Sequence, residues 1–420
     1  MDHNLKVILQ NARDSADIVG TLSIQKRNGV LKSLAEALMK HTSKIMAANA
    51  KDFAVLPSNY ALADRLWMTE IRIKKMAQTL TLLAKMPDPL GVEREARVMP
   101  NKLMIRRVSV PLGVLGIIYE ARPDITIEIS GLAIKSGNVA VLKGGTDAYH
   151  TNVCLVEVMH KVLDEHQLPR SIISIINPKN RQLVRQMLRA NDFIDVIIPR
   201  GGQSLIEYVR ENASVPIIET GAGVCHIYVH RNANLEWAKN SVINAKLRRP
   251  SVCNALDTLL VDREVAEVLL KAVADSLIAD SVLIHADERS FSILKHIYPQ
   301  HLLTKATKSD FGKEFLGYEM AIKVVRGSQE AMKHIARYGS RHSEAIMTDN
   351  NDVAEDFVNH IDAAAVYINA PTSFTDGFEF GLGAEVGIST QKLHARGPMG
   401  LEALTSSKWI IRGQGQVRSV

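Results

Sequence analysis

The sequence lacks the features that mark secreted, membrane and metal-binding proteins. Its three cysteines (Cys154, Cys225 and Cys253) are an odd number without paired spacing, so neither a disulfide framework nor a metal site is predicted. No hydrophobic run approaches the roughly 20 residues of a membrane-spanning helix. The first residues do not have the basic-then-apolar order of a signal peptide. We therefore expect a cytoplasmic protein with reduced thiols and no membrane partner.

Aromatic residues are also scarce, at 5% of the chain, which argues against a surface that stacks single-stranded nucleic acid. The net charge is +6, but the positive residues are dispersed rather than gathered in a run. A basic site for a phosphorylated or carboxylate small molecule fits the same charge. We expect such a small-molecule substrate and no nucleic acid as partner.

The length of 420 residues suits two domains. Roughly the first 90 residues have helical periodicity, and from Leu103 short β-rich runs alternate with helical stretches. This alternation predicts an α/β fold with a parallel, doubly wound sheet. The expected strands are Val114–Tyr119, Val139–Leu142, Ile172–Ile176, Val196–Ile198 and Pro216–Ile218.

A second alternating run predicts a second α/β domain beginning near Cys225. Its expected strands are Asp257–Val261, Val282–Ile284, Ala321–Val325, Glu344–Met347 and Ala365–Ile368. A terminal strand at Ser407–Arg412 needs a partner sheet, which another subunit could supply. We therefore divide the chain into a cofactor domain at 1–225, with a possible oligomerisation strand at 103–113, a catalytic domain at 226–375, and a substrate-loop and oligomerisation segment at 376–420.

The segment from Asn244 to Asn254 contains the strongest candidate for catalysis. Cys253 follows Pro250 and lies close in sequence to Lys246, Arg248 and Arg249. Positive charge lowers the pKa of a thiol and so favours the reactive thiolate. A small buried residue is the alternative, because most cysteines are structural.

Glycine-rich turns follow two of the expected strands. One contains Lys143 before Gly144-Gly145, and the other contains Arg200, Gly201 and Gly202. Backbone amides at such turns, with a helix N-terminus behind them, can hold a phosphate, although each turn can equally be a plain connection. Two of them at corresponding strand ends favour a dinucleotide.

Two further segments carry polar residues that a packed core does not require. Glu219 emerges from an apolar run into a glycine-rich turn, where it can act as a general base or cap the amides of the turn. Cys225 is interpreted as a core residue. Near the end of the chain, His394 and Arg396 lie in a glycine-rich loop, where they can meet an anionic substrate or simply belong to a chain reversal.

Several segments together closely resemble the γ-glutamyl phosphate reductase family of the aldehyde dehydrogenase superfamily. The resemblance runs over nearly the whole chain and is most specific in the last of these segments. They are Val110–Asp124, Ile198–Gly202, Gly223–Tyr228, Arg249–Cys253 and Phe380–Leu401. The resemblance implies an aldehyde dehydrogenase-like fold, with two doubly wound α/β domains and an oligomerisation arm.

The resemblance also implies a reaction, the NADPH-dependent reduction of L-glutamyl 5-phosphate to L-glutamate 5-semialdehyde, the second step of proline biosynthesis from glutamate. Cys253 stands where the nucleophile of the family stands and would form a thioester. A hydrolytic NAD(P)-dependent aldehyde dehydrogenase and a catalytically decayed nucleotide-binding homologue are the alternatives. A homo-oligomer and substrate transfer from a glutamate 5-kinase are the partners that it implies.

The resemblance assigns further residues to the cofactor and the substrate. Arg122, Asn254, His394 and Arg396 are assigned to the substrate. The residues assigned to the NADP(H) site are Lys143, Arg200, Gly201, Gly202, Glu219 and Glu314. Glu219 also stands where the superfamily has its general base, which a phosphate reductase does not need.

The chain departs from the family pattern near these residues. Asp124 replaces the usual asparagine after Arg122-Pro123, and it can serve there as a helix N-cap. Ser373 replaces an arginine of the family. Neither departure affects the thiol itself.

Overall fold

The computed structural model describes residues 1–57, 63–120, 122–177 and 180–418. These residues group into two compact units. The first unit contains 1–220, 381–387 and 399–420, and the second contains 221–380 and 388–398. The segment 376–420, which we expected to stand apart, is thus shared between the two units.

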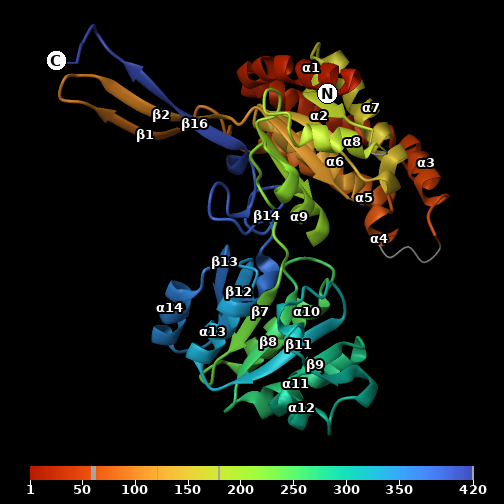
Figure 1. The fold of residues 1–420 in the computed structure, drawn as a ribbon, viewed down its shortest axis with the longest axis vertical. Coiled ribbons are helices and arrows are strands. Elements are labelled where there is room, and N and C mark those ends of the chain that lie inside the picture. The colour runs from red at the N-terminus through yellow and green to blue at the C-terminus, as the bar shows by residue number, and fades with distance from the viewer. Residues whose placement is uncertain (58–62, 121, 178–179, 419–420) are drawn as a thin grey trace. The chain divides into compact units, whose positions relative to one another are not determined.

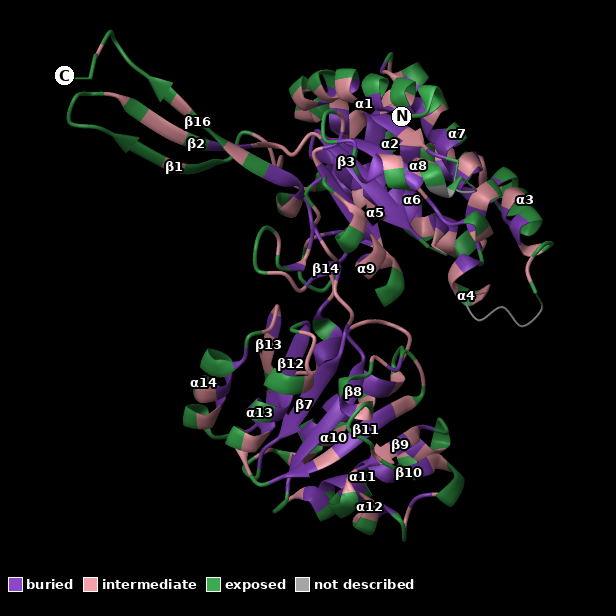
Figure 2. Ribbon diagram, viewed as in Figure 1, coloured by how far each residue is buried: buried purple, intermediate pink, exposed green. Residues whose placement is uncertain are grey.

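The first unit is built on a four-stranded parallel sheet with the order β5-β4-β3-β6 (Figure 1). Its strands are almost wholly apolar and buried, as is typical of a parallel sheet (Figure 2). They are β3 (Val114–Tyr119), β4 (Val139–Lys143), β5 (Ile173–Ile175) and β6 (Val196–Arg200). The helices of this unit are α1 (His3–Thr21), α2 (Ile24–Lys40), α3 (Thr42–Phe53), α4 (Ala63–Leu66), α5 (Glu70–Lys85), α6 (Pro123–Lys135), α7 (Tyr149–Glu165), α8 (Arg181–Met187) and α9 (Gln203–Asn212).

One predicted strand of this unit does not form. Pro216–Ile218 makes only a single bridge, between Ile217 and Ile197 of β6. Proline has no N–H to donate to a ladder, so the segment joins β6 through the carbonyl of Pro216 and the N–H of Ile218 instead. The other four strands that we expected here agree with the structure to within two residues.

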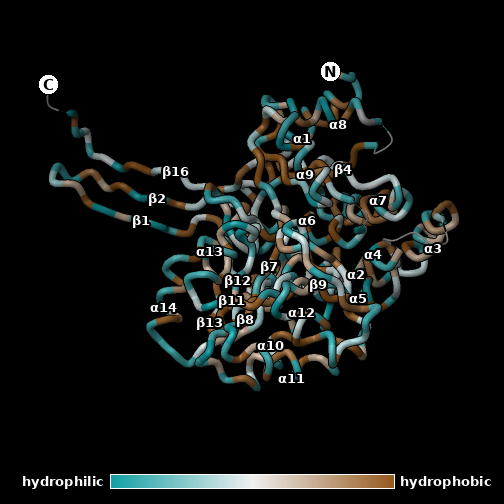
Figure 3. Tube along the Cα trace, turned by 60° about the horizontal axis from the view of Figure 1, so that its bottom comes forward, coloured by the Kyte–Doolittle hydropathy of each residue, from teal (hydrophilic) through white to brown (hydrophobic). Residues whose placement is uncertain are grey.

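A three-stranded antiparallel sheet extends from the first unit (Figure 1). We call it the arm; it consists of β1 (Glu93–Val98), β2 (Met104–Pro111) and β16 (Thr405–Arg412). The predicted strands at 103–113 and Ser407–Arg412 are both confirmed, and they pair with each other. β1 is mostly hydrophilic, whereas β2 and β16 also carry hydrophobic residues (Figure 3). Trp409 and Ile411 of β16 are about half exposed.

The second unit is a seven-stranded parallel sheet with the order β10-β9-β11-β8-β7-β12-β13. Apolar side chains of α10, α11 and α12 pack on one face, and those of α13 and α14 pack on the other. The sheet is therefore doubly wound, as predicted. Its strands are β7 (Cys225–Val229), β8 (Leu256–Asp262), β9 (Leu283–Ala286), β10 (Leu303–Lys305), β11 (Glu319–Val325), β12 (Ser343–Met347) and β13 (Ala365–Ile368). The helices are α10 (Leu235–Leu247), α11 (Ala266–Ala279), α12 (Glu288–Leu294), α13 (Ser328–Tyr338) and α14 (Asn351–His360), and a short pair, β14 (Ile388–Ser389) and β15 (Gly397–Pro398), completes the unit.

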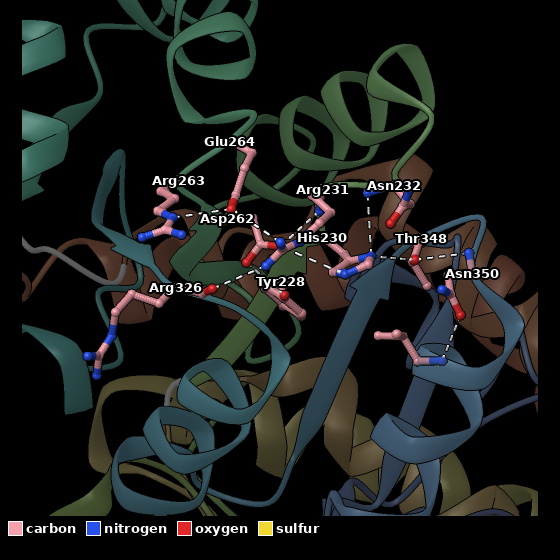
Figure 4. A network of polar contacts seen from close by, with 11 residues as sticks. Tyr228, His230, Arg231, Asn232, Asp262, Arg263, Glu264, Arg326, Thr348 and Asn350 are labelled. Carbon is pink, nitrogen blue, oxygen red and sulfur yellow. Dashed lines mark hydrogen bonds and ion pairs between the residues drawn. The ribbon is translucent and has the colours of Figure 1, made fainter.

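The carboxyl ends of the central strands of this sheet are joined by a network of polar side chains (Figure 4). The fully buried Asp262 at the end of β8 accepts hydrogen bonds from the Tyr228 hydroxyl (2.9 Å) and from the backbone and side chain of Arg231 (3.0 and 3.2 Å). His230, at the end of β7, contacts Thr348 at the end of β12 (2.9 Å). The network connects the carboxyl ends of these strands. Cys253 precedes β8 and therefore lies toward the opposite, amino-terminal ends of the strands.

Among the described helices, none combines the length and the apolar composition that crossing a membrane requires.

Candidate active site

The local sequence explains the position of Cys253. Asn234 caps α10 by accepting hydrogen bonds from the N–H groups of Glu236 and Trp237 (both 3.1 Å), and the helix ends at Leu247, shortly before Pro250. The chain then turns and enters β8 at Leu256. Cys253 lies in this turn and is half-buried, so its thiol is neither a core side chain nor a fully exposed one.

The cationic flank predicted for Cys253 is only partly present. Lys246 is fully buried, and its ammonium donates a hydrogen bond to the carbonyl of Leu256 (2.9 Å). Burial lowers the pKa of Lys246 to about 8. Its role is therefore to hold the turn, whereas Arg248 and Arg249 are exposed.

Cys225 is a core residue, as predicted, but it also contacts the turn. It is fully buried, and its thiol donates a hydrogen bond to the carbonyl of Cys253 (3.2 Å). Burial, together with the charge of Asp257, raises the pKa of Cys225 well above its usual value, so this thiol stays protonated. His342, at 3.7 Å, is its other neighbour.

The backbone of Gly223 lies directly against the cysteine turn. A Cβ atom at Gly223 would lie 1.6 Å from the Cys253 carbonyl oxygen, so only glycine fits there. The N–H of Gly223 donates a hydrogen bond to Glu314 Oε1 (2.9 Å). Sequence reasoning named Cys253 and Glu314 separately, and Gly223 is the residue that brings them together. Its signal was the Gly221-Ala222-Gly223 turn itself.

Asn254 has a structural role that the sequence did not reveal. Its side-chain N–H groups donate to the backbone carbonyls of Ser373 (3.2 Å) and Thr375 (2.9 Å), and its backbone carbonyl accepts from the Thr372 hydroxyl (2.8 Å). Ser373 in turn donates to Asn244 (2.7 Å). Asn254 is buried, so it anchors the loop 372–375 beneath the cysteine turn. Its assignment to the substrate stays a prediction.

The loop with His394 and Arg396 is held by an acidic residue. Asp362 contacts Lys392 Nζ (2.9 Å) and Arg396 Nη2 (2.7 Å), and these two partners lower the pKa of its carboxyl. The charge of Arg396 is thus matched within the protein. His394 is exposed and has a φ of 20°, a backbone conformation that side chains rarely adopt.

The remaining predicted residues belong to the first unit. Lys143 and Arg200 are the last residues of β4 and β6, and both are half-buried; Gly201 and Gly202 are exposed and directly precede α9. Because β4 and β6 are parallel and both pair with β3, these residues lie at the carboxyl ends of strands in one sheet. The predicted pair of glycine-containing turns is therefore present there.

One backbone amide before α9 already binds an anionic group. The N–H of Gly202 donates to Glu120 Oε2 (3.0 Å), and this carboxylate lies beside Gly201. Here a carboxylate oxygen occupies the position that a phosphate oxygen would take at a helix N-terminus. The N–H of Gly202 therefore already binds an oxygen anion, which is the kind of contact that the predicted phosphate site requires.

The other two predicted residues of this unit are Arg122, which precedes α6, and Glu219, which follows α9. Arg122 is half-buried at the N-cap of α6, and Glu219 is half-buried, 3.8 Å from Arg210. Ala121, within one of the matching segments, lies outside the described residues. Asp124 is not at the N-cap of α6 but in its first turn. A negative charge in this turn interacts favourably with the helix dipole.

The carboxyl of Glu128, one turn further along α6, has its pKa raised to about 8 by burial and by the charge of Asp124. Arg200 and Arg122 act in the opposite direction. Burial and the neighbouring carboxyl of Asp124 thus favour the protonated form of Glu128.

Comparison with known proteins identifies the fold and the relatives. The profile of the aldehyde dehydrogenase family matches residues 2–288. The chain is 48% identical to the γ-glutamyl phosphate reductase of Moorella thermoacetica (97% of each chain covered) and 45% identical to that of Chlorobium limicola (100% of each). The crystal structure of the γ-glutamyl phosphate reductase from Thermotoga maritima is 40% identical, with a TM-score of 0.93 over 99% of this chain and 100% of that one. An acetylating aldehyde dehydrogenase from Geobacillus thermoglucosidasius shares the fold, with a TM-score of 0.73 at 15% identity, over 99% of this chain and 98% of that one.

Proposed function

The chain belongs to the aldehyde dehydrogenase family, and on this premise we propose that it reduces L-glutamyl 5-phosphate to L-glutamate 5-semialdehyde and phosphate in proline biosynthesis. The observation that carries the proposal is the near-full-length identity to γ-glutamyl phosphate reductases. A half-buried cysteine at the entry to β8 supports it, since acyl-phosphate reduction requires an accessible thiol.

The chemistry begins at Cys253. Its thiolate attacks the acyl carbonyl carbon, the C–O bond to phosphate breaks, and a thioester forms. NADPH, when bound, would supply the hydride for reduction of this thioester. Cys253 then carries a hemithioacetal, which collapses to the aldehyde and returns the thiolate. An oxyanion develops in each addition step, and the backbone N–H of Cys253 is the donor that we assign to it.

Family membership implies a nicotinamide cofactor, and NADP(H) is the form that we propose. Lys143 would contact the adenosine ribose or its 2′-phosphate, and Gly201 and Gly202 would hold the diphosphate. Arg200 would line the same site. Glu314 would bind the nicotinamide ribose, and its contact with Gly223 supports this assignment because Gly223 packs on the Cys253 carbonyl.

The substrate is a small molecule with an α-carboxylate, an α-ammonium and an acyl phosphate. Arg122, Asn254, His394 and Arg396 are the residues that we assign to it. A basic surplus of +6 suits such an anion. The proposal places the enzyme in the cytoplasm, where a glutamate 5-kinase would deliver the unstable acyl phosphate.

We also propose that the chain forms a homo-oligomer through the arm. β16 is an edge strand, and its Trp409 and Ile411 are 49% and 55% exposed. An exposed hydrophobic edge strand is a template for pairing with another chain. A second copy of the protein would cover it.

The alternative reaction is hydrolysis of the thioester with Glu219 as the general base. The half-buried carboxylate of Glu219, near Arg210, is the observation that favours it. A decayed homologue that only binds nucleotide is a further alternative, motivated by Asp124 and Ser373. Phosphate dependence separates all three.

The test is the reverse reaction. Purified protein receives pyrroline-5-carboxylate, which equilibrates with the semialdehyde, plus NADP⁺, with and without inorganic phosphate. We expect NADPH formation that requires phosphate and is lost in Cys253→Ala but kept in the matched control Cys154→Ala. Turnover without phosphate would mean that water accepts the acyl group, and bound NADP⁺ without turnover would mean a decayed site.

A further inference from the structure

A buried carboxylate lies behind the cysteine turn and has no part in the reaction above. Asp257 is 2% exposed and stands four residues after Cys253, near the start of β8. Its neighbours along the strand are apolar or uncharged. A carboxylate in such a place is costly unless specific groups bind it. The structure supplies those groups from two other segments.

The strand ladder is interrupted at Asp257. Cys225 of β7 pairs with Leu256 of β8, but the next residue, His226, pairs with Thr258. Asp257 is therefore the extra residue of a β-bulge, without a partner on β7. Bulges are rare between parallel strands, and they commonly redirect a side chain beside an active site.

The redirected carboxylate binds two backbone groups. Asp257 Oδ2 accepts the N–H of Cys225 (3.3 Å), and Oδ1 accepts the N–H of Phe315 (3.0 Å). The first group opens β7, two residues after Gly223. The second directly follows Glu314. One carboxylate thus joins the segment that packs on Cys253 to the segment that carries the proposed ribose ligand.

The contact between Glu314 and Gly223 closes this arrangement into a ring. Starting from Asp257, it runs through Phe315 to Glu314, across the 2.9 Å hydrogen bond to Gly223, and along the chain to Cys225 and back. The Cys253 carbonyl lies against it, held by the Cys225 thiol and by Gly223. A shift of Asp257 must therefore move both segments.

The surroundings of Asp257 act on its charge in opposite directions. Burial raises the pKa of Asp257 to about 7, and the buried ammonium of Lys246 is the main group that opposes this shift by stabilising the carboxylate. Lys246 also lies 6.0 Å above the Phe315 ring, and His285 stacks on that ring at 5.4 Å. The aromatic ring of Phe315, whose N–H binds Asp257, is thus packed against both Lys246 and His285.

We propose that Asp257 is a positioning residue that fixes the Cys253 turn and the Glu314 loop relative to each other, so that cofactor affinity and thiol reactivity depend on one carboxylate. The inference rests on the proposed cofactor role of Glu314. Asp257 contacts neither substrate nor cofactor; it acts through backbone groups.

The first test compares two isosteric variants on the same strand. Asp257→Asn replaces a carboxylate oxygen that accepts a backbone N–H by an amide group that can donate instead. Asp262→Asn makes the same replacement at the other end of β8, away from Gly223 and Glu314. NADPH binding is measured by titration of its fluorescence, without turnover. We expect the Kd to rise at least tenfold in Asp257→Asn and to stay within twofold of the wild-type value in Asp262→Asn.

A second readout does not depend on the cofactor. The rate at which iodoacetamide alkylates Cys253 is measured against pH, with peptide mapping to identify the labelled thiol. The profile should shift in Asp257→Asn and remain unchanged in Asp262→Asn. Folded Asp257→Asn protein with wild-type affinity and a wild-type profile would overturn the proposal.

A third variant covers the case in which Asp257→Asn does not fold. Asp257→Glu keeps the charge opposite Lys246 but lengthens the side chain, so Phe315 and Glu314 must move. We expect an intermediate rise in the Kd for NADPH, and no change in affinity or thiol profile would contradict the inference. If the wild type binds NADPH without phosphate-dependent turnover, the proposed function fails while this comparison still decides the role of Asp257. If NADPH does not bind, the alkylation profile decides it.

Discussion

Adding one methyl group at Gly223 should disable the active site. The Cβ atom of Gly223→Ala would lie 1.6 Å from the Cys253 carbonyl oxygen, 2.5 Å from its carbon and 2.8 Å from its Cα. All three are backbone atoms, so no side chain can rotate away. Ordinary van der Waals contact begins at 3.4 Å, and the two segments must therefore separate by well over 1 Å.

The size of the effect follows from this displacement. A shift of about 1 Å in a reacting group costs on the order of 100-fold in rate. Overpacking costs typically about 1–3 kcal/mol of stability, and the Glu314 contact with Gly223 is lost as well. We expect Gly223→Ala to lower kcat/KM at least about 100-fold.

The assay is phosphate-dependent NADPH formation from the semialdehyde, together with the unfolding midpoint. Gly312→Ala is the matched control, because its Cβ would meet only Tyr338, at 3.6 Å. That variant should keep wild-type activity. Folded Gly223→Ala protein with wild-type kcat/KM would refute the claim that the Gly223 backbone sets the position of the nucleophile.

Three further predictions follow from burial and charge. Asp262→Asn should lower the free energy of unfolding by about 2 kcal/mol, since the Tyr228 hydroxyl and the partly exposed Arg231 lose a charged hydrogen-bond acceptor; a urea midpoint equal to that of the wild type would contradict this. Burial lowers the pKa of His342 from 6.5 to about 4, so the unfolded chain binds a proton that the folded one does not; its contribution to stability is complete above pH 6.5 and is lost as the pH falls toward 4. Urea midpoints measured over that interval should fall less in His342→Asn than in the wild type, and equal slopes would argue against it. Iodoacetamide should label Cys253 before Cys154 and Cys225, which are 5% and 0% exposed, and peptide mapping that finds either of them first would count against the assignment.

Strand periodicity made most of the fold predictable. Apolar runs such as Val114–Tyr119 and Ala365–Ile368 form strands with the predicted bounds. Pro216–Ile218 failed because proline cannot donate to a ladder. β1 was missed since its sequence, Glu93–Val98, is mostly charged and exposed; its stability comes from pairing with β2.

The site was predictable only where the residue type itself carries chemistry. Cys253 could be identified from its sequence surroundings, but Lys246 could not be recognised as a buried structural ammonium, because burial depends on the packing of α10 and β8. The structural role of Asn254 could not be recognised for the same reason. Gly223 and Asp257 act through backbone contacts between distant segments, and a single sequence does not record such contacts. An aspartate inside the apolar run Ala255–Val261 was the signal available for Asp257.

The central claim is that the acyl group is carried by Cys253. The most direct measurement is the intact mass of the protein after incubation with the semialdehyde and NADP⁺ in the absence of phosphate, followed by peptide mapping. The account predicts a glutamyl thioester on Cys253 that disappears when phosphate is added and does not form in Cys253→Ser. NADPH formation without this adduct, or an adduct on another residue, would contradict it.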